Sequence, residues 1–308
     1  MTSQVLRIAT RKSPLALWQA NHVAEKIKQF WPSVVIELVP MTTSGDKFLK
    51  DKLLTVGGKG LFVKELEEAL LANQADIAVH SMKDVPAFFP DGLSLATICE
   101  RHNPFDAFIA NNYQTLQELP SGSIVGTSSL RRQSQLLALR SDIKIQSLRG
   151  NINTRLGKLR AGEFDAIILA VSGLERMELQ DSIGEILTEE QMLPACGQGA
   201  LGIECRADDT TILKLLAPLS DPLSTICVGT ERQVNALLGG NCHVPLAVYA
   251  RVEAEKRIML RAKILTLDGQ TVISDQQEGL LADAETLANN CAKALEAKGA
   301  AKLLAQAL

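Results

Sequence analysis

The chain has 308 residues, of which 46% are hydrophobic and 22% charged, and its formal net charge is −3. This length predicts two or three domains, and this composition excludes a wholly disordered chain. Aromatic residues make up only 4%, too few for the stacking surfaces of proteins that bind single-stranded nucleic acid, and the negative net charge argues against nucleic-acid and membrane partners.

Membrane, secretory and metal-binding signals are missing from the sequence. No stretch approaches the ~20 consecutive apolar residues of a membrane helix. The first ten residues lack the basic flank, apolar core and cleavage site of a signal peptide, so we expect a cytoplasmic protein. Six cysteines occur without a CxxC pair or zinc-like spacing, so we expect no structural metal and mostly buried, reduced thiols.

The first hundred residues alternate between strand-like and helix-like patterns. Ser13 and Pro14 have the N-cap and first-residue types of a helix that follows a short strand. The connection 41–60 contains four lysines and the run Gly-Gly-Lys-Gly at 57–60, and its length predicts a mobile functional loop. The other expected elements are strands at 5–10, 34–39 and 76–80 and a helix at 61–73.

The same plan partly repeats further along the chain. Strands are expected at 123–127, 143–148 and 165–170, each followed by a helix. We interpret this repeat as two α/β domains, each with helices on both faces of a mostly parallel sheet. Beyond residue 219 the pattern predicts a helix, three strands with a hairpin turn at Asp268-Gly269, and one long terminal helix, which together form a small α+β domain. The expected domains are 1–99 with 199–218, 100–198, and 219–308.

Basic side chains gather where predicted strands end. Residues 125–160 carry a net charge of +7, which leaves −10 for the rest of the chain. Ligands of open α/β sheets bind beyond the carboxyl ends of strands, and helix N-termini there favour anions. A solvated helix face is the simpler explanation for any one arginine, but the recurrence favours a site for a molecule with several carboxylates or phosphates. The residues concerned are Arg11, Lys83, Thr127, Ser129, Arg131, Arg132, Arg149 and Arg176.

Three other residues each allow both a functional and an ordinary structural interpretation. Asp84 follows Lys83 and either forms a local salt bridge or, as an ionised carboxylate among cations, stabilises a developing positive charge. Cys242 lies in the loop Gly239-Gly-Asn-Cys-His243, where it is either an ordinary loop cysteine or a covalent attachment point. His80, within an apolar strand, is expected to be a core histidine rather than a metal ligand.

Taken together, these residues resemble the porphobilinogen deaminase (hydroxymethylbilane synthase) family. The resemblance covers essentially the whole chain, and its motifs lie at 6–16, 57–62, 76–86, 126–132, 148–151 and 194–204. It implies two domains like those of periplasmic binding proteins, followed by a small C-terminal domain.

The resemblance also implies a reaction and a cofactor. The expected enzyme is a transferase of haem biosynthesis that joins four porphobilinogen molecules head to tail, releases ammonia at each step and finally releases hydroxymethylbilane. The implied primer is a dipyrromethane cofactor, bound through a thioether to the position of Cys242. The implied partners are porphobilinogen and the growing pyrrole chain, and the protein is expected to be a monomer.

Site residues are carried over position by position. Asp84 matches the catalytic aspartate, and Lys59 lies in the active-site loop. The implied cofactor-binding residues are Lys83, Thr127, Ser129, Arg131, Arg132, Arg149 and Arg155. The implied substrate-binding residues are Arg11, Ser13, Ser81 and Arg176, and no metal is expected.

One departure and one alternative accompany this interpretation. Asn241 stands immediately before the attachment cysteine, where the family usually has a small residue; asparagine tolerates the left-handed backbone region, so we expect the turn to be kept. The alternative function is a cytoplasmic two-lobed receptor that binds anions without catalysis. That alternative explains the arginines and the repeated α/β plan but gives Cys242 no role.

Overall fold

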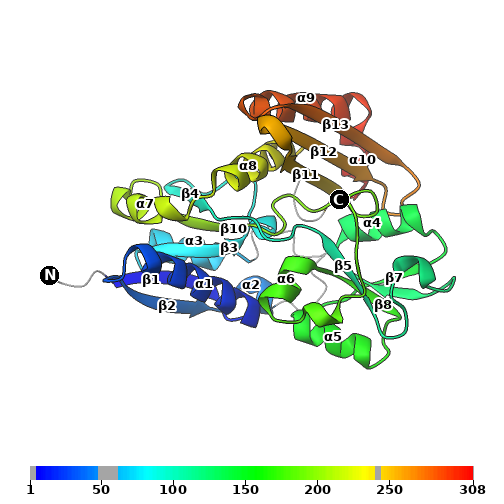
Figure 1. Ribbon diagram of the computed structural model, residues 1–308, viewed down its shortest axis with the longest axis horizontal. Helices are drawn as coiled ribbons and strands as arrows, with labels where there is room; N and C mark the ends of the chain where they lie inside the picture. Colours follow the sequence, from blue (N-terminus) through cyan, green and yellow to red (C-terminus); the bar gives the residue numbers. More distant parts are fainter. Residues whose placement is uncertain (1–4, 48–61, 240–243, 308) are drawn as a thin grey trace. The chain divides into compact units, whose positions relative to one another are not determined.

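The computed structural model describes residues 5–47, 62–239 and 244–307 (Figure 1). The chain divides into two compact units. The first unit is Met1–Arg101 with Ala200–Thr225, and the second is His102–Gly199 with Ile226–Leu308. The domain boundaries expected from the sequence stay a prediction.

The first unit contains a five-stranded sheet with the order β2-β1-β3-β10-β4. β1 pairs in parallel with β2 and β3, whereas β10 runs antiparallel to both β3 and β4. Four strands therefore run in one direction and β10 runs against them. The strands are β1 (Val5–Arg11), β2 (Val35–Met41), β3 (Ile77–Ser81), β4 (Leu93–Ile98) and β10 (Leu201–Arg206).

Helices cover both faces of this first sheet because its strands carry apolar residues on both faces. Ile8 and Val79 lie in one core cluster with residues of α1 and α7. Ala9 and Ala78, the alternate residues, pack against Leu66 and other residues of α3. The helices are α1 (Pro14–Phe30), α2 (Ser44–Lys47), α3 (Lys64–Leu71) and α7 (Thr210–Leu216), with short 3₁₀ turns η3 (Met82–Asp84) and η6 (Ala217–Leu219).

The second unit contains a sheet of the same plan, with the order β7-β6-β8-β5-β9. β6 pairs in parallel with β7 and β8, and β5 runs antiparallel to β8 and β9, so β5 takes the place that β10 has in the first sheet. The strands are β5 (Asp106–Ala110), β6 (Ile124–Gly126), β7 (Lys144–Gln146), β8 (Ala166–Ala170) and β9 (Glu185–Ile186).

Helices again lie on both faces of the second sheet. Leu136 of α4 packs with Phe108 and Val125 on one face. Residues of α5 and α6 pack with Ile109 and Ile167 on the other. The helices are α4 (Leu130–Leu139), α5 (Ile152–Arg160) and α6 (Val171–Arg176), with 3₁₀ turns η4 (Leu116–Glu118) and η5 (Gln180–Ser182). The predicted pair of α/β sheets with one common plan is therefore confirmed.

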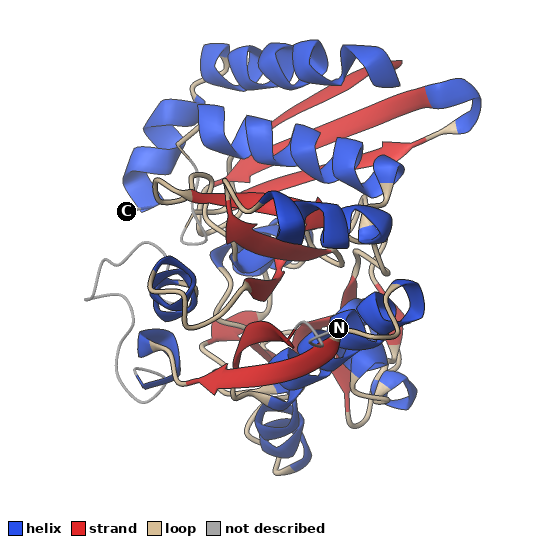
Figure 2. Ribbon diagram, turned by 90° about the vertical axis from the view of Figure 1, so that its left-hand side faces the viewer, coloured by secondary structure: helices blue, strands red, loops and turns tan. Residues whose placement is uncertain are grey.

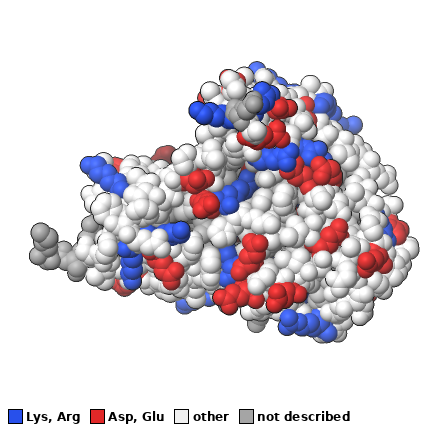
Figure 3. Space-filling model, in the orientation of Figure 1, with Lys and Arg blue, Asp and Glu red and all other residues white. Residues whose placement is uncertain are grey.

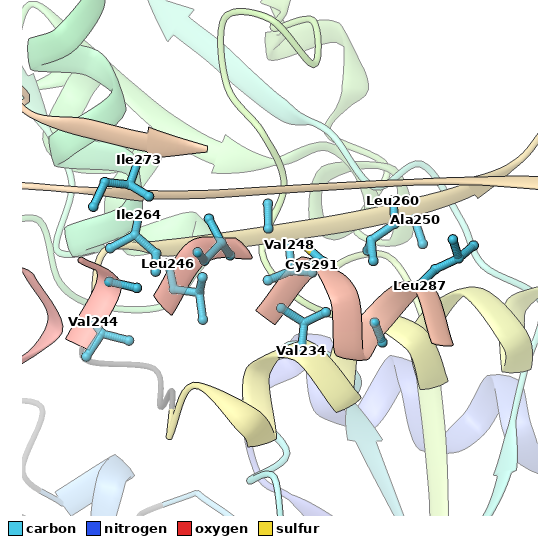
Figure 4. Close-up of a cluster of buried hydrophobic side chains, with 14 of the residues drawn as sticks. Val234, Val244, Leu246, Val248, Ala250, Leu260, Ile264, Ile273, Leu287 and Cys291 are labelled. Atoms are coloured by element: carbon cyan, nitrogen blue, oxygen red, sulfur yellow. The ribbon is translucent and has the colours of Figure 1, made fainter. Parts of the chain in front are cut away.

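A three-stranded antiparallel sheet completes the second unit, in the order β11-β12-β13 (Figures 1 and 2). Its inner face and the helices beside it form one apolar core, in which Val248 and Leu260 meet Val234, Leu287 and Cys291 (Figure 4). The elements are α8 (Pro222–Leu237), β11 (Leu246–Val252), the 3₁₀ turn η7 (Ala254–Lys256), β12 (Arg257–Leu265), β13 (Val272–Leu280), the 3₁₀ turn η8 (Leu281–Asp283), α9 (Ala284–Ala297) and α10 (Ala300–Ala307).

The end of the chain corrects one sequence expectation. The single terminal helix is wrong, because α9 and α10 are separate helices joined through Gly299. Gly299 has a φ of +96°, in the left-handed region that ends helices and that glycine adopts without a steric cost. The predicted α+β character of this segment is confirmed.

No single helix in the described ranges is long and apolar enough to cross a membrane. One bent pair, Thr210–Leu219 with Pro222–Leu237, passes that test of length and composition only when its two parts are taken together.

Candidate active site

Asp84 lies in a short turn at the end of β3. The turn is anchored by Met82, which is buried against β10 at Gly202; a Cβ on Gly202 would overlap the Met82 side chain. Ser81, the last residue of β3, accepts a hydrogen bond from Gln19 Nε2 of α1 at 2.8 Å. Asp84 itself is half-buried, and within the described part of the chain no ion pair or hydrogen bond holds its carboxylate. The local salt bridge to Lys83 is therefore not formed.

Arg11 and Ser13 follow β1 in the same unit. The Arg11 guanidinium lies over the Phe62 ring, 4.2 Å from its centroid, in a cation–π contact. Phe62 in turn packs over Gly45, where any Cβ would overlap the ring. Ser13 is the N-cap of α1, and its hydroxyl accepts from the Ala16 N–H at 3.3 Å, so this serine has a structural role besides the predicted one.

A second set of predicted residues lies where β6 meets α4. Thr127 Oγ1 accepts from the Ser129 N–H at 3.2 Å. Ser129 caps α4, and its hydroxyl accepts from the Arg132 N–H at 3.4 Å. The local sequence therefore places the side chains of Arg131 and Arg132 in the first turn of α4.

Asp106, a residue that the sequence analysis missed, lies between these two arginines. Its carboxylate is 0% exposed and accepts from Arg131 Nη2 at 2.7 Å, from Arg132 Nη2 at 2.7 Å and Nε at 3.1 Å, and from Gln198 Nε2 at 3.0 Å. Burial alone would raise the pKa of Asp106, but the two guanidiniums hold that pKa well below its usual range. The only sequence signal was an acid at the start of the otherwise apolar strand β5.

The arginine pair is also bound by backbone carbonyls. Arg131 Nη1 donates to Leu193 O at 2.7 Å, and Arg132 Nη1 donates to Ile168 O at 2.9 Å. The two arginines are only 5% and 6% exposed. Two guanidiniums and one carboxylate leave this buried cluster with a net charge of +1, and burial lowers the pKa of Arg131.

Arg149, Arg155 and Arg176 have different surroundings. Arg149 is half-buried in the loop after β7. Arg155 is half-buried on α5, and its Nε donates to Gly150 O at 2.7 Å, so α5 and this loop are tied together. Arg176 is buried, and its Nη2 donates to Gly199 O at 2.7 Å.

The remaining basic residues of the 125–160 segment differ in exposure: two lie at the surface, whereas Lys158 is half-buried and the Arg140 side chain is only 14% exposed. Arg140 pairs with Asp142 at 2.7 Å and donates to the carbonyls of Leu116 and Leu119. Lys144 and Arg160 are exposed. Figure 3 shows acidic and basic side chains interspersed on the face that it draws, with no continuous basic surface there.

Several expectations fall outside the described residues. Cys242, Asn241 and Lys59 are among them, together with most of the predicted loop 41–60. The described site residues form two sets. The first unit holds Arg11, Ser13, Ser81, Lys83 and Asp84, and the second holds Thr127, Ser129, Arg131, Arg132, Arg149, Arg155 and Arg176.

His80 is a core histidine, as predicted. It is buried, and its Nε2 lies 2.9 Å from Glu204 Oε2. No group of three or more His, Cys, Asp or Glu residues suited to a metal ion occurs among the residues that the structure describes.

The chain matches two models of one protein family. The family model "Porphobilinogen deaminase, dipyromethane cofactor binding domain" matches residues 6–214, and "Porphobilinogen deaminase, C-terminal domain" matches residues 225–297. The chain belongs to the porphobilinogen deaminase family. The porphobilinogen deaminases of Legionella pneumophila strains Paris and Lens are 60% and 59% identical to it over 304 residues, which is 99% of this chain and 98% of each relative.

Solved structures that resemble the chain include the periplasmic aliphatic sulphonate binding protein SsuA from Escherichia coli. That match has 14% identity and a TM-score of 0.41 and covers 76% of this chain and 70% of that one. Within the porphobilinogen deaminase match, both described sets of site residues fall in the cofactor-binding domain, whereas Cys242 falls in the C-terminal domain.

The described residues fit a dipyrromethane cofactor in their chemistry. Guanidiniums and hydroxyls are donors suited to the carboxylates that each pyrrole unit carries. Among the described residues, Arg131 and Arg132 pair with one carboxylate, that of Asp106, so the buried cluster keeps one positive charge. A further carboxylate bound at this cluster would neutralise it.

Proposed function

We propose that this chain joins four porphobilinogen molecules head to tail, releases ammonia at each step and finally releases hydroxymethylbilane. The observation that carries the proposal is the family match over 6–214 and 225–297, which includes both the Asp84 turn and the loop of Cys242. The half-buried Asp84 carboxylate and the cationic side chains at strand ends support it.

Asp84 is proposed as the catalytic residue. When porphobilinogen loses ammonia from its aminomethyl group, the pyrrole becomes electron-poor and its nitrogen shares a positive charge. A fixed carboxylate beside that nitrogen accepts its N–H and stabilises the developing cation without reorganising. The Met82 anchor and the Ser81–Gln19 hydrogen bond hold the turn that carries Asp84.

The cationic residues are proposed to bind pyrrole carboxylates. A guanidinium has five N–H donors, and the hydrogen bonds described above use two of Arg131 and three of Arg132, so both retain donors for a further carboxylate. The dipyrromethane cofactor supplies the pyrrole carbon to which the first substrate unit is joined. Its proposed ligands are Cys242, Lys83, Thr127, Ser129, Arg131, Arg132, Arg149 and Arg155.

Substrate binding and the cellular setting complete the proposal. Arg11, Ser13, Ser81 and Arg176 are proposed to bind porphobilinogen and the growing chain, and Lys59 is proposed to act from a loop over the site. The protein is proposed to be a cytoplasmic monomer without nucleic-acid, membrane or metal partners.

Intact mass measurement followed by peptide mapping tests the proposal. We expect a mass excess of two pyrrole units on the peptide that contains Cys242, lost in Cys242→Ser and retained in the control Cys196→Ser. Asp84→Glu keeps the charge but moves it by a methylene, so the excess should persist while turnover falls by about 10²-fold.

The results also separate the enzyme from the receptor alternative. An unmodified wild-type protein that binds organic anions but releases no ammonia from porphobilinogen would favour the receptor. Undiminished turnover in Asp84→Glu would remove Asp84 from the catalytic role while leaving the cofactor assignment intact.

A further inference from the structure

Three titratable side chains meet in the core of the first unit, on the side of the sheet that α3 covers. Glu204 of β10 is paired with Ala78 of β3, so it shares a face with His80, two residues along. His80 Nε2 lies 2.9 Å from Glu204 Oε2. Glu67 lies on α3, whose neighbouring Leu66 and Leu70 pack with Ala78 on this same face. Glu67, His80 and Glu204 are 8%, 5% and 1% exposed.

The hydrogen bonds of this cluster are incomplete. His80 binds one oxygen of Glu204, but the other oxygen, Oε1, is buried without a hydrogen-bond partner among the described residues. Glu67 Oε1 is buried without a partner in the same way. Ionised carboxylates only accept hydrogen bonds, and a buried acceptor without a donor is destabilising. A proton on one carboxyl group supplies the missing donor.

The cations on α3 and on the strands packed against it have other partners. On the strands beside α3, Arg7 and Arg206 both bind Asp76, and Arg11 lies over Phe62. On α3 itself, Lys64 pairs with Glu68 at the surface, and Glu65 accepts from the Ser44 N–H. Burial and then the nearby Glu204 charge raise the pKa of Glu67 to about 7, against the smaller lowering effect of His80.

We propose that Glu67 is a positioning residue, held as a neutral acid that shares its proton with Glu204 and so keeps α3 packed against β3 and β10. β3 ends at Ser81, the residue after His80, and leads directly into the turn that carries Asp84. Ionisation of Glu67 places a second negative charge against Glu204 in this core. The repulsion loosens α3 from the two strands and displaces the end of β3. The effect on turnover rests on the proposed role of Asp84, whereas the shared proton does not.

The variant Glu67→Gln tests the shared proton, because glutamine keeps an N–H donor at that position but does not ionise. The matched control is Glu68→Gln, one residue away on α3, whose side chain is 62% exposed. A group with a raised pKa stabilises the fold at low pH and loses that contribution as the pH rises through its folded pKa. We therefore expect the wild type and Glu68→Gln, but not Glu67→Gln, to lose thermal stability as the pH rises from the ordinary pKa of about 4.5 to the folded pKa of about 7.

Two further readouts separate positioning from a purely structural role. The wild-type infrared spectrum should show a protonated carboxyl band that bleaches between about pH 6 and pH 8, as Glu67 ionises in the folded protein, and that is missing in Glu67→Gln. The kcat of the loaded enzyme should fall over the same range in the wild type and stay flat in Glu67→Gln, with KM unchanged.

Each result bears on a definite part of the proposal. An unchanged pH slope of stability in Glu67→Gln, or no bleaching carboxyl band, overturns the shared proton. The expected stability data together with an unaltered kcat profile overturn the positioning role. Should Glu67→Gln not fold, Glu204→Gln takes its place. Removing the neighbouring charge should lower the pKa of Glu67, because its carboxylate then faces a neutral N–H donor, and so shift the loss of stability to lower pH. An unshifted loss overturns the proposal.

Discussion

The Asp106 carboxylate accepts four N–H groups and thereby orients two arginines that local sequence alone leaves free to rotate. Arg131 and Arg132 are adjacent in the first turn of α4, and neighbouring helical residues point in different directions. Asp106, from β5, and the carbonyls of Leu193 and Ile168 draw both guanidiniums into one buried cluster. The orientation of the pair therefore depends on a residue outside α4.

Replacement of Asp106 by asparagine should destabilise the second unit. Removing one member of a buried charge cluster leaves the other charges uncompensated and costs about 3–5 kcal/mol. Denaturant unfolding at neutral pH measures this loss, and the mass of the purified variant reports whether the cofactor still loads. Asp142→Asn is the control: the carboxylate that it removes is exposed, so loss of its pair with Arg140 should lower the unfolding midpoint much less.

Sequence could predict the arginines but not their partner. Arg131 and Arg132 follow a strand and open a helix, and that placement is a local pattern. Asp106 is one acid in an apolar strand, and nothing near it in sequence says which charge it meets. The pairing of His80 with Glu204 could not be predicted from local sequence either, because it depends on how β3 and β10 pair.

Among the secondary-structure elements, the β12–β13 hairpin packs closely on α4. Gly269 in its turn has a φ of +72°. A Cβ at this position would overlap Ala138 N and would lie 2.6 Å from Ser134 O, both in the backbone of α4. Backbone atoms inside a helix cannot move aside as a side chain can. The hairpin can therefore reach α4 only with glycine at this position.

Gly269→Ala should lower the free energy of unfolding by about 3 kcal/mol or more, because left-handed strain and overpacking act together. Gly122→Ala is the matched control: it has a φ of +83° but nothing within 4 Å, so it carries only the conformational cost of about 1–2 kcal/mol. Chemical denaturation of both variants gives the comparison. Equal losses in the two would show that contact with α4 contributes nothing.

The order of elements was largely predictable, because hydrophobic periodicity is a local property of the chain. The strand-to-helix transition at Ser13 followed from N-cap chemistry, and Ser13 caps α1 in the structure. A second transition was predicted near Ser129, which caps α4. Strand pairing was not predictable in this way. β10 lies between β3 and β4, although its residues are about a hundred positions further along the chain, and no local pattern specifies that insertion.

The whole molecule should be most stable in a pH window whose acid and alkaline limits are set by different titratable groups. Arg7 holds the pKa of Asp76 below its usual value despite burial, and Arg131 and Arg132 do the same for Asp106. Carboxylates with lowered pKa values stabilise the fold above the unfolded value, and this contribution is lost as the pH falls. On the other side, Glu67 with a pKa of about 7 loses its contribution as the pH rises.

Calorimetric melting temperatures over a pH series measure that window. We expect them to fall below about pH 4, where Asp76 and Asp106 begin to be protonated as the chain unfolds. We also expect the Glu67 contribution to be lost as the pH rises from about 4.5 to about 7. Both units contribute to the acid side, since each holds one of the two aspartates. A melting temperature at about pH 3 equal to that at about pH 5 would contradict the assignment of these buried pairs.

Because β10 lies between β3 and β4, the two five-stranded sheets become complete at different points during translation. All five strands of the second sheet lie between Asp106 and Ile186, in one continuous stretch of chain. The first sheet begins at Val5 but lacks the strand between β3 and β4 until Arg206 has been synthesised. During translation, the edges of β3 and β4 that pair with β10 therefore stay unpaired, whereas all five strands of the second sheet are already available. A nascent chain released before residue 206 exposes those edges to other chains, and unpaired strand edges favour aggregation.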